Sequence, residues 1–181
     1  STAGGLVVEA DVGEIVDRLL AVLTQAGTSL SRMRDGEATS SEAAPPTRRF
    51  DFVHNADLRP VLEQAYLDSR RAFDGGDFRQ AFILSSSVLE AIVTDALRDA
   101  EHTGAGLEAG GELSFDTRIA AAERAGLIHG GCARLPRVAR SYRDLTDAAG
   151  DLLPDVTISE REARLTGQVL RVVMRDLDPG R

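Results

Sequence analysis

The first regular pattern along the chain is an apolar seam near its N-terminus. Apolar residues recur there at alternating spacings of four and three, at Val12, Val16, Leu19, Leu23, Ala26, Leu30 and Met33. This heptad spacing predicts an amphipathic helix that begins at Asp11, with Glu14 completing a capping box. Its apolar face needs a partner surface, which is either the rest of the same chain or the same helix of a second copy.

The residues that follow this seam, 34–49, have no periodicity and are rich in small and polar side chains. Such a composition predicts a flexible linker. We therefore expect three segments, namely an N-terminal helical arm over residues 1–33, a linker over residues 34–49 and a helical bundle over residues 50–178.

The bundle begins with two helices whose ends are marked by capping and turn residues. Asp57 is a suitable N-cap for the first helix, which is expected to end at Gly75-Gly76. Asp77 is a suitable N-cap for the second helix, which is apolar on nearly every side as far as Leu97. A helix that is apolar all round is expected to lie buried at the centre of the domain.

Three more helices are expected towards the C-terminus. A short helix starts at Ser114 and is closed by Gly126, and a longer one covers residues 132–149 with Pro136 in its first turn. The last helix begins with a capping box at residues 159–162. Because no stretch shows the alternation of a strand, the sequence predicts an all-α bundle of about five helices with an additional N-terminal helical arm.

Composition excludes several classes of function. The 181 residues carry 21 basic and 29 acidic side chains, a net charge of −8, and every basic residue is arginine. Without lysine, a Schiff-base mechanism and the usual phosphate-binding P-loop are excluded. A single cysteine excludes an internal disulfide framework. No apolar run approaches the ~18 residues of a membrane span and no signal segment is recognisable, so we expect a cytoplasmic protein that does not contact a membrane.

Metal and nucleophile chemistry have little support in the residue pattern. The three histidines, His54, His102 and His129, lie in separate segments, and each is expected to be a solvated turn residue. No Glu-x-x-His motif occurs, so we expect neither a metal site nor a cofactor. The lone thiol, Cys132, is expected to behave as a small buried hydrophobic residue.

Four arginines stand close together in this acidic chain, at Arg134, Arg137, Arg140 and Arg143. On one continuous helix they would cover about half of the circumference, because a spacing of three residues drifts by about 60° per step. They form either a solvated face paired with acids of neighbouring helices, or a positive surface that binds phosphate or an acidic partner. In an acidic protein, such a surface would bind bulk nucleic acid weakly and in a salt-sensitive way.

The order of several short motifs resembles bacterial helical proteins of the HEPN superfamily. The resemblance covers residues 50–178 and is carried by Phe50-Asp51-Phe52-Val53, Asp57-Leu58-Arg59, Ala72-Phe73-Asp74-Gly75-Gly76-Asp77-Phe78, Ser87-Val88-Leu89-Glu90-Ala91, Ala125-Gly126-Leu127-Ile128, Tyr142-Arg143-Asp144-Leu145 and Ile158-Ser159-Glu160-Arg161-Glu162-Ala163. The resemblance implies an α-helical bundle that dimerises. It also implies a stress or phage-defence context, in which many members are metal-independent ribonucleases.

The chain departs from the motif that the resemblance implies for catalysis, which is an arginine, a polar residue and then a histidine. Arg143 and Asp144 match the first two positions, but Asp147 stands where the histidine is expected. An exposed aspartate has a pKa of about 3.9, so it is a poor general acid at neutral pH and repels phosphate. Asp147 could act only if a neighbour such as Glu90 raised its pKa, whereas Glu90 is otherwise expected to be a buried carboxylate satisfied by arginine or helix donors. His129 is a further candidate for the missing imidazole.

These features predict a homodimeric HEPN-like module that is catalytically degenerate and binds RNA, a nucleotide or an acidic protein partner through Arg134, Arg137, Arg140 and Arg143. The enzyme alternative is a metal-independent endoribonuclease that uses Arg143 with Asp147, Glu90 or His129 as a non-standard acid or base. The third alternative is a purely structural homodimer whose arginines form ion pairs between subunits.

Overall fold

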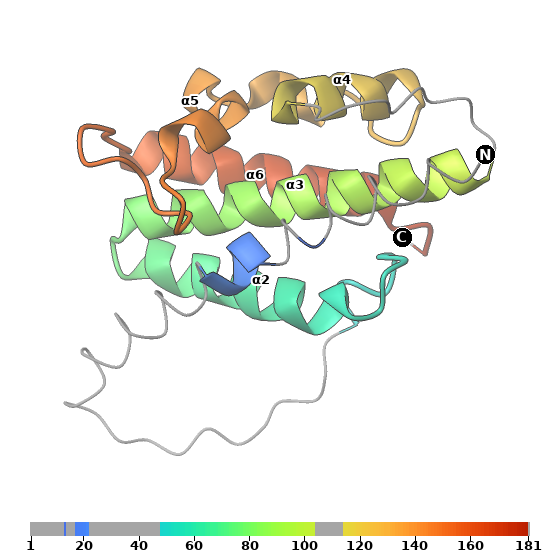
Figure 1. Cartoon of the computed structure of the whole chain (residues 1–181), viewed down its shortest axis with the longest axis horizontal. Helices are drawn as coiled ribbons and strands as arrows, with labels where there is room; N and C mark the ends of the chain where they lie inside the picture. The colour runs from blue at the N-terminus through green and yellow to red at the C-terminus, as the bar shows by residue number, and fades with distance from the viewer. Residues whose placement is uncertain (1–12, 14–16, 22–47, 104–113, 181) are drawn as a thin grey trace, which may run out of the picture.

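The computed structural model describes residues 13, 17–21, 48–103 and 114–180 (Figure 1). Residues 13 and 17–21 are helical, as the N-terminal seam predicts. The other residues of the predicted N-terminal arm, residues 34–47 of the predicted linker and residues 104–113 lie outside the described residues. Within the described part of the chain, the fold is all-α, as predicted, and its one β-type contact is an isolated bridge between Thr146 and Leu152.

Helix α3 (Phe78–His102) is the centre of the fold, as its all-round apolar pattern predicts. It packs against α2 (Leu58–Asp74), α4 (Phe115–Arg124) and α6 (Glu160–Leu177). Figure 1 shows α2 and α4 on opposite sides of α3, with α6 alongside it. Among the described residues, α3 is the one helix long and apolar enough to cross a membrane, but 94% of its most apolar window is buried in the protein. Such burial is typical of the core helix of a soluble protein.

The two predicted aspartate caps differ in the structure. The Asp77 carboxylate accepts a hydrogen bond of 3.1 Å from the backbone N–H of Gln80 and so caps α3. Asp57 precedes α2 with helical dihedral angles, and its side chain makes no capping hydrogen bond. The prediction for Asp57 is therefore right in position and wrong in mechanism, since a residue that already has helical dihedrals does not turn its carboxylate towards the free N–H groups.

Helices α4 and α6 begin as predicted. The Ser114 hydroxyl accepts from the backbone N–H of Thr117, at 3.2 Å, and Gly126 follows α4 with a φ of +71°. Helix α6 begins with the complete capping box, because Ser159 caps the helix and the Glu162 carboxylate accepts from the Ser159 N–H.

The predicted long helix over residues 132–149 is wrong. The structure has three short pieces there: the 3-10 helix η1 (Gly131–Arg134), the single turn α5 (Arg137–Arg140) and the 3-10 helix η2 (Tyr142–Leu145). Pro136 stands before α5 in an extended conformation with a ψ of 148°, and the preceding residue, Leu135, is extended too. Proline forces its predecessor away from helical dihedrals, so the chain cannot continue as one helix through this point.

The difference between the two aspartates provides a matched test of the fold. Asp77→Ala is expected to lower the free energy of unfolding by about 1 kcal/mol, because it removes an N-cap hydrogen bond. Asp57→Ala is expected to change it by less than about 0.5 kcal/mol. Urea denaturation of the two variants measures both values, and equal losses would contradict the structural distinction between the two caps.

Candidate functional site

A buried cluster of charged side chains joins α3 to the segment that follows α5. The side chain of Glu90, on α3, is only 1% exposed, and its Oε1 lies 3.0 Å from Nη1 of Arg143. The hydroxyl of Tyr142 donates a hydrogen bond to Glu90 Oε2. Arg118, on α4, is also buried, with its Nη1 3.8 Å from Glu90 Oε1, and it donates to the hydroxyl of Thr94 at 2.7 Å. The Glu90 carboxylate is therefore shared by two arginines and a tyrosine, which compensates the cost of burying its charge.

This environment also fixes the protonation state of Tyr142. Burial, followed by the negative charge of Glu90 and their hydrogen bond, holds the Tyr142 pKa well above its ordinary value of 10. The phenol therefore remains a hydrogen-bond donor at physiological pH and does not serve as a base. Its ring also packs edge-on against Phe115, with the ring centroids 5.5 Å apart.

Glu90 is thus a buried carboxylate paired with arginine, which is the structural role that the sequence analysis gives it as the alternative to a catalytic one. The side chain that sequence reasoning placed beside it, Asp147, is exposed and has other contacts. The Asp147 carboxylate accepts from the backbone N–H groups of Ala149, at 2.9 Å, and Asp151, at 3.0 Å. Asp147 is therefore a turn-forming residue, and Glu90 is committed to Arg143, Arg118 and Tyr142.

A surface pocket of about 300 Å³ lies where η2, α5, the start of α4 and the N-terminal helical segment meet. Its lining is mainly polar and includes Arg18, Arg140 and Arg143 together with the hydroxyl residues Ser114 and Ser141. Phe115 and Asp144 complete the lining. We call this the arginine pocket.

The arginine pocket collects two of the four clustered arginines. Arg140 is oriented by Asp116, which it contacts through Nη1, and by the backbone carbonyl of Cys132, to which its Nη2 donates at 2.9 Å. Arg134 and Arg137 are exposed and do not line the pocket. The break at Pro136 explains this division, because the four arginines do not share one helix as the sequence suggested.

Sequence reasoning missed Arg18, which lies in the N-terminal segment more than a hundred residues before Arg140. No local pattern connects the two positions, and only the packing of that segment on the bundle brings them together. The described lining has three arginines and one aspartate. Two of these arginines already have carboxylate partners, Asp116 for Arg140 and Glu90 for Arg143, so the pocket offers guanidinium donors rather than a large net positive charge. Arginine forks beside hydroxyl donors match the oxygens of a phosphate or carboxylate group.

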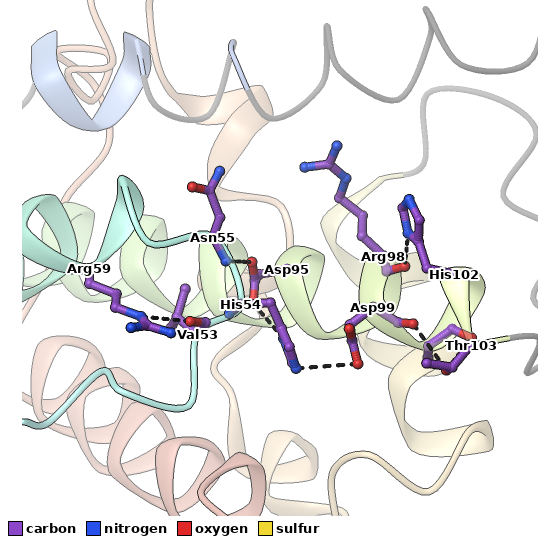
Figure 2. Close-up of polar contacts among 10 residues, drawn as sticks. Val53, His54, Asn55, Arg59, Asp95, Arg98, Asp99, His102 and Thr103 are labelled. Atoms are coloured by element: carbon purple, nitrogen blue, oxygen red, sulfur yellow. Dashed lines mark hydrogen bonds and ion pairs between the residues drawn. The ribbon is translucent and has the colours of Figure 1, made fainter.

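All three histidines of the chain contact other groups. Figure 2 shows His54 against α3, where its Nδ1 lies 3.1 Å from Asp95 and its Nε2 lies 3.2 Å from Asp99. His102 is the last residue of α3 rather than a turn residue, and its Nδ1 lies 2.6 Å from the carbonyl oxygen of Arg98. His129 Nδ1 lies 3.6 Å from Asp176 on α6.

No histidine therefore lines the arginine pocket, so the proposed contribution of His129 to a site at Arg143 has no contact within one chain. No group of three or more potential metal ligands is present among the described residues. The pocket offers donors for an anion and, within its described lining, no imidazole for proton transfer at neutral pH.

The thiol of Cys132 is buried, and the backbone carbonyl of the same residue accepts a hydrogen bond from Arg140. Burial, reinforced by the charge of Glu123 and opposed by Arg140, raises its pKa to about 12. As predicted, Cys132 behaves as a small hydrophobic residue, since the thiolate is strongly disfavoured at neutral pH.

Comparisons with known proteins add no assignment, because no family model, curated protein or solved structure matches the chain.

The Glu90 cluster should dominate the stability of this region. We expect Glu90→Ala and Arg143→Ala each to lower the free energy of unfolding by about 3–5 kcal/mol, because each leaves a buried charge with reduced compensation. The double variant should lose clearly less than the sum of the two losses, since the second substitution removes a charge that the first has already isolated. Urea denaturation of the four proteins of this cycle measures the coupling, and strictly additive losses would exclude the buried pair.

The raised pKa of Cys132 predicts slow alkylation. At pH 8, a thiol whose pKa is about 12 is ionised in only about one molecule in 10,000, whereas an unfolded thiol with a pKa of about 8.5 is ionised in roughly a quarter of molecules. Iodoacetamide should therefore react about 1,000-fold more slowly with the folded protein than with the urea-unfolded protein, and burial adds to this difference. The folded-state rate should still be rising between pH 9 and pH 10, where the unfolded-state rate levels off. Equal rates in the two states would contradict the buried position.

Proposed function

We propose that the protein is a non-catalytic binding module that holds a phosphate group of RNA or of a nucleotide in the arginine pocket. The observation that carries the proposal is the convergence of Arg18, Arg140 and Arg143 with two serine hydroxyls on one pocket of an acidic protein. Guanidinium groups bind phosphate bidentately, and hydroxyls supply further donors. A site with few arginines, with Asp144 also in its lining, should bind RNA weakly and in a salt-sensitive way.

The contacts of the candidate acid–base groups favour binding of the phosphate over cleavage of the RNA. Glu90 is 1% exposed and pairs with Arg143, and Asp147 accepts hydrogen bonds from its own turn. A general acid–base group must reach the proton that it transfers and have a pKa near the working pH. None of the three histidine rings lines the pocket, which supports a degenerate site over a metal-independent endoribonuclease.

The proposal includes a HEPN-like, cytoplasmic homodimer. The order of the sequence motifs supports the HEPN-like assignment, and the all-α bundle is compatible with it. The homodimer follows from the family resemblance alone, because Leu19, the one seam residue among the described residues, packs into the core of its own chain. Dimerisation would bring a second arginine pocket into the same assembly, so that one RNA strand could contact both.

Binding of a fluorescein-labelled single-stranded RNA, followed by anisotropy at about 50 and 200 mM NaCl, tests this function. We expect Arg18→Gln and Arg140→Gln each to weaken binding by about tenfold or more, because each removes charge-assisted hydrogen bonds to phosphate. Competition with AMP and with inorganic phosphate shows whether the phosphate group alone is recognised.

Arg134→Gln and Arg137→Gln are matched controls, because they make the same change of charge at exposed positions outside the pocket. Equal weakening by all four variants would indicate a diffuse basic surface and would overturn the pocket as the site. Cleavage of the RNA without added metal that is lost in Arg143→Gln, with a thermal melt showing that this variant is folded, would instead establish the endoribonuclease. Absence of RNA and nucleotide binding, together with dissociation of a dimer in the arginine variants, would favour the purely structural homodimer.

A further inference from the structure

A second surface groove, separate in its lining from the arginine pocket, runs between α2 and α6 above α3. Its volume is about 250 Å³, just below the ~300–1,000 Å³ of typical small-molecule sites. The aromatic rings of Tyr66 and Phe73, from α2, and the side chain of Leu170, from α6, give it an apolar interior. The groove therefore offers an apolar body a place on the surface where water would be displaced.

Positive charge surrounds this apolar interior. Arg70 from α2 and Arg164 and Arg171 from α6 line the groove, and none of its described lining residues carries a carboxylate. Arg164 lies over the ring of Phe73, 5.7 Å from its centroid, and pairs with Glu160 on the preceding turn of α6. Arg70 and Arg171 are exposed and make no ion pair within the described part of the chain. Two guanidinium groups at the groove are therefore available to an anion.

Gly167 keeps the groove open between α2 and α6. It lies inside α6, where glycine is less stable than alanine because the backbone loses more freedom on folding. Its backbone does not require glycine, since its φ is not positive, and an added Cβ would meet nothing closer than the Ser85 hydroxyl, at 3.9 Å. Packing within the chain thus tolerates a side chain here, and the unfilled space remains as part of the groove.

We propose that this groove binds a small amphiphilic anion, a molecule with an apolar chain or ring and one carboxylate, phosphate or sulfonate group. The apolar part lies against Phe73 and Leu170, and the anionic group is held by Arg70 and Arg171. Charge complementarity selects the anion over a neutral or cationic amphiphile, because burying an apolar body beside unpaired arginines is most favourable when the ligand supplies the counter-charge. The small volume favours a small molecule over the face of a partner helix, which would need a longer groove.

Isothermal titration calorimetry of the full chain with octanoate tests the site. Octanoate should bind with a measurable heat, and acetate, 1-octanol and octylamine at equal concentrations should bind at least about tenfold more weakly, which corresponds to about 1.4 kcal/mol. Acetate lacks the apolar body, 1-octanol lacks the charge, and octylamine carries the opposite charge. Octyl phosphate and octyl sulfonate, run as further arms, rank the three anionic groups.

Four variants locate the binding. Gly167→Leu should abolish octanoate binding by filling the groove, whereas Gly167→Ala should retain it, because a single Cβ leaves most of the space open. The double variant Arg70→Gln/Arg171→Gln should weaken octanoate binding at least about tenfold while leaving 1-octanol binding unchanged. The double variant Arg124→Gln/Arg137→Gln, at two exposed arginines outside the groove, is the charge-matched control and should bind octanoate as the parent does. Thermal melts of every variant identify any that fail to fold.

The following results would each overturn the proposal. Octanoate binding that survives in folded Gly167→Leu, or that falls equally in Arg124→Gln/Arg137→Gln, would place the ligand elsewhere. Equal affinity for octanoate and octylamine would exclude an anion site. If octanoate does not bind but an acidic amphipathic helical peptide of leucine and glutamate does, and Gly167→Leu abolishes that binding, the groove is a protein-docking site instead. None of these readouts involves the arginine pocket, so they leave the RNA-binding proposal to its own test.

Discussion

The C-terminal half of the fold depends on the contacts that the buried carboxylate of Glu90 makes. Glu90 lies on the central helix α3 and contacts Arg118 from α4 and both Tyr142 and Arg143 from η2. Helix α4 is short, and the segment from residue 131 to 145 consists of single turns that have little stability of their own. These pieces are held in position because Arg118, Tyr142 and Arg143 all contact one carboxylate whose side chain is only 1% exposed. Removal of any member of the cluster would leave a buried charge with reduced compensation, which makes the arrangement specific.

This constraint also shapes the arginine pocket. Because η2 is anchored through Tyr142 and Arg143, the adjacent Ser141 and Asp144 are presented at a defined place on the surface. Arg140 is oriented from the same side by Asp116 and by the carbonyl of Cys132. Arg140 and Arg143 are therefore already ordered, and holding these two side chains in place costs little when an anion binds.

Much of the bundle follows from patterns within single segments. The all-round apolar pattern located α3, and the residues Asp77, Ser114 and Ser159 marked the beginnings of their helices because a cap depends on atoms only a few positions away. The prediction of one helix over residues 132–149 was wrong because it relied on an apolar stripe of helical period. Pro136 disfavours helical dihedral angles at the residue before it, so the helix cannot run through this point. Three contacts could not be predicted from local patterns: the approach of Arg18 to Arg140 and Arg143, the pairing of Glu90 with Arg118, and the approach of His54 to Asp95 and Asp99. Each depends on how distant segments pack, and no spacing along the chain encodes it.

The same buried carboxylate determines what kind of chemistry Arg143 supports. Arg143 is 14% exposed, and Glu90 compensates its charge before any ligand arrives, so it offers a fixed donor rather than a strong positive field. Arg140 differs, because its partner Asp116 is 57% exposed, and an exposed ion pair is weak enough to be exchanged for a phosphate. Stabilisation of a transition state requires charge that is aimed at the developing anion and not already compensated. In this pocket the charge of Arg143 is already balanced by Glu90, and Arg140 can exchange Asp116 for a phosphate. Such a pocket is better suited to holding a phosphate than to cleaving its ester.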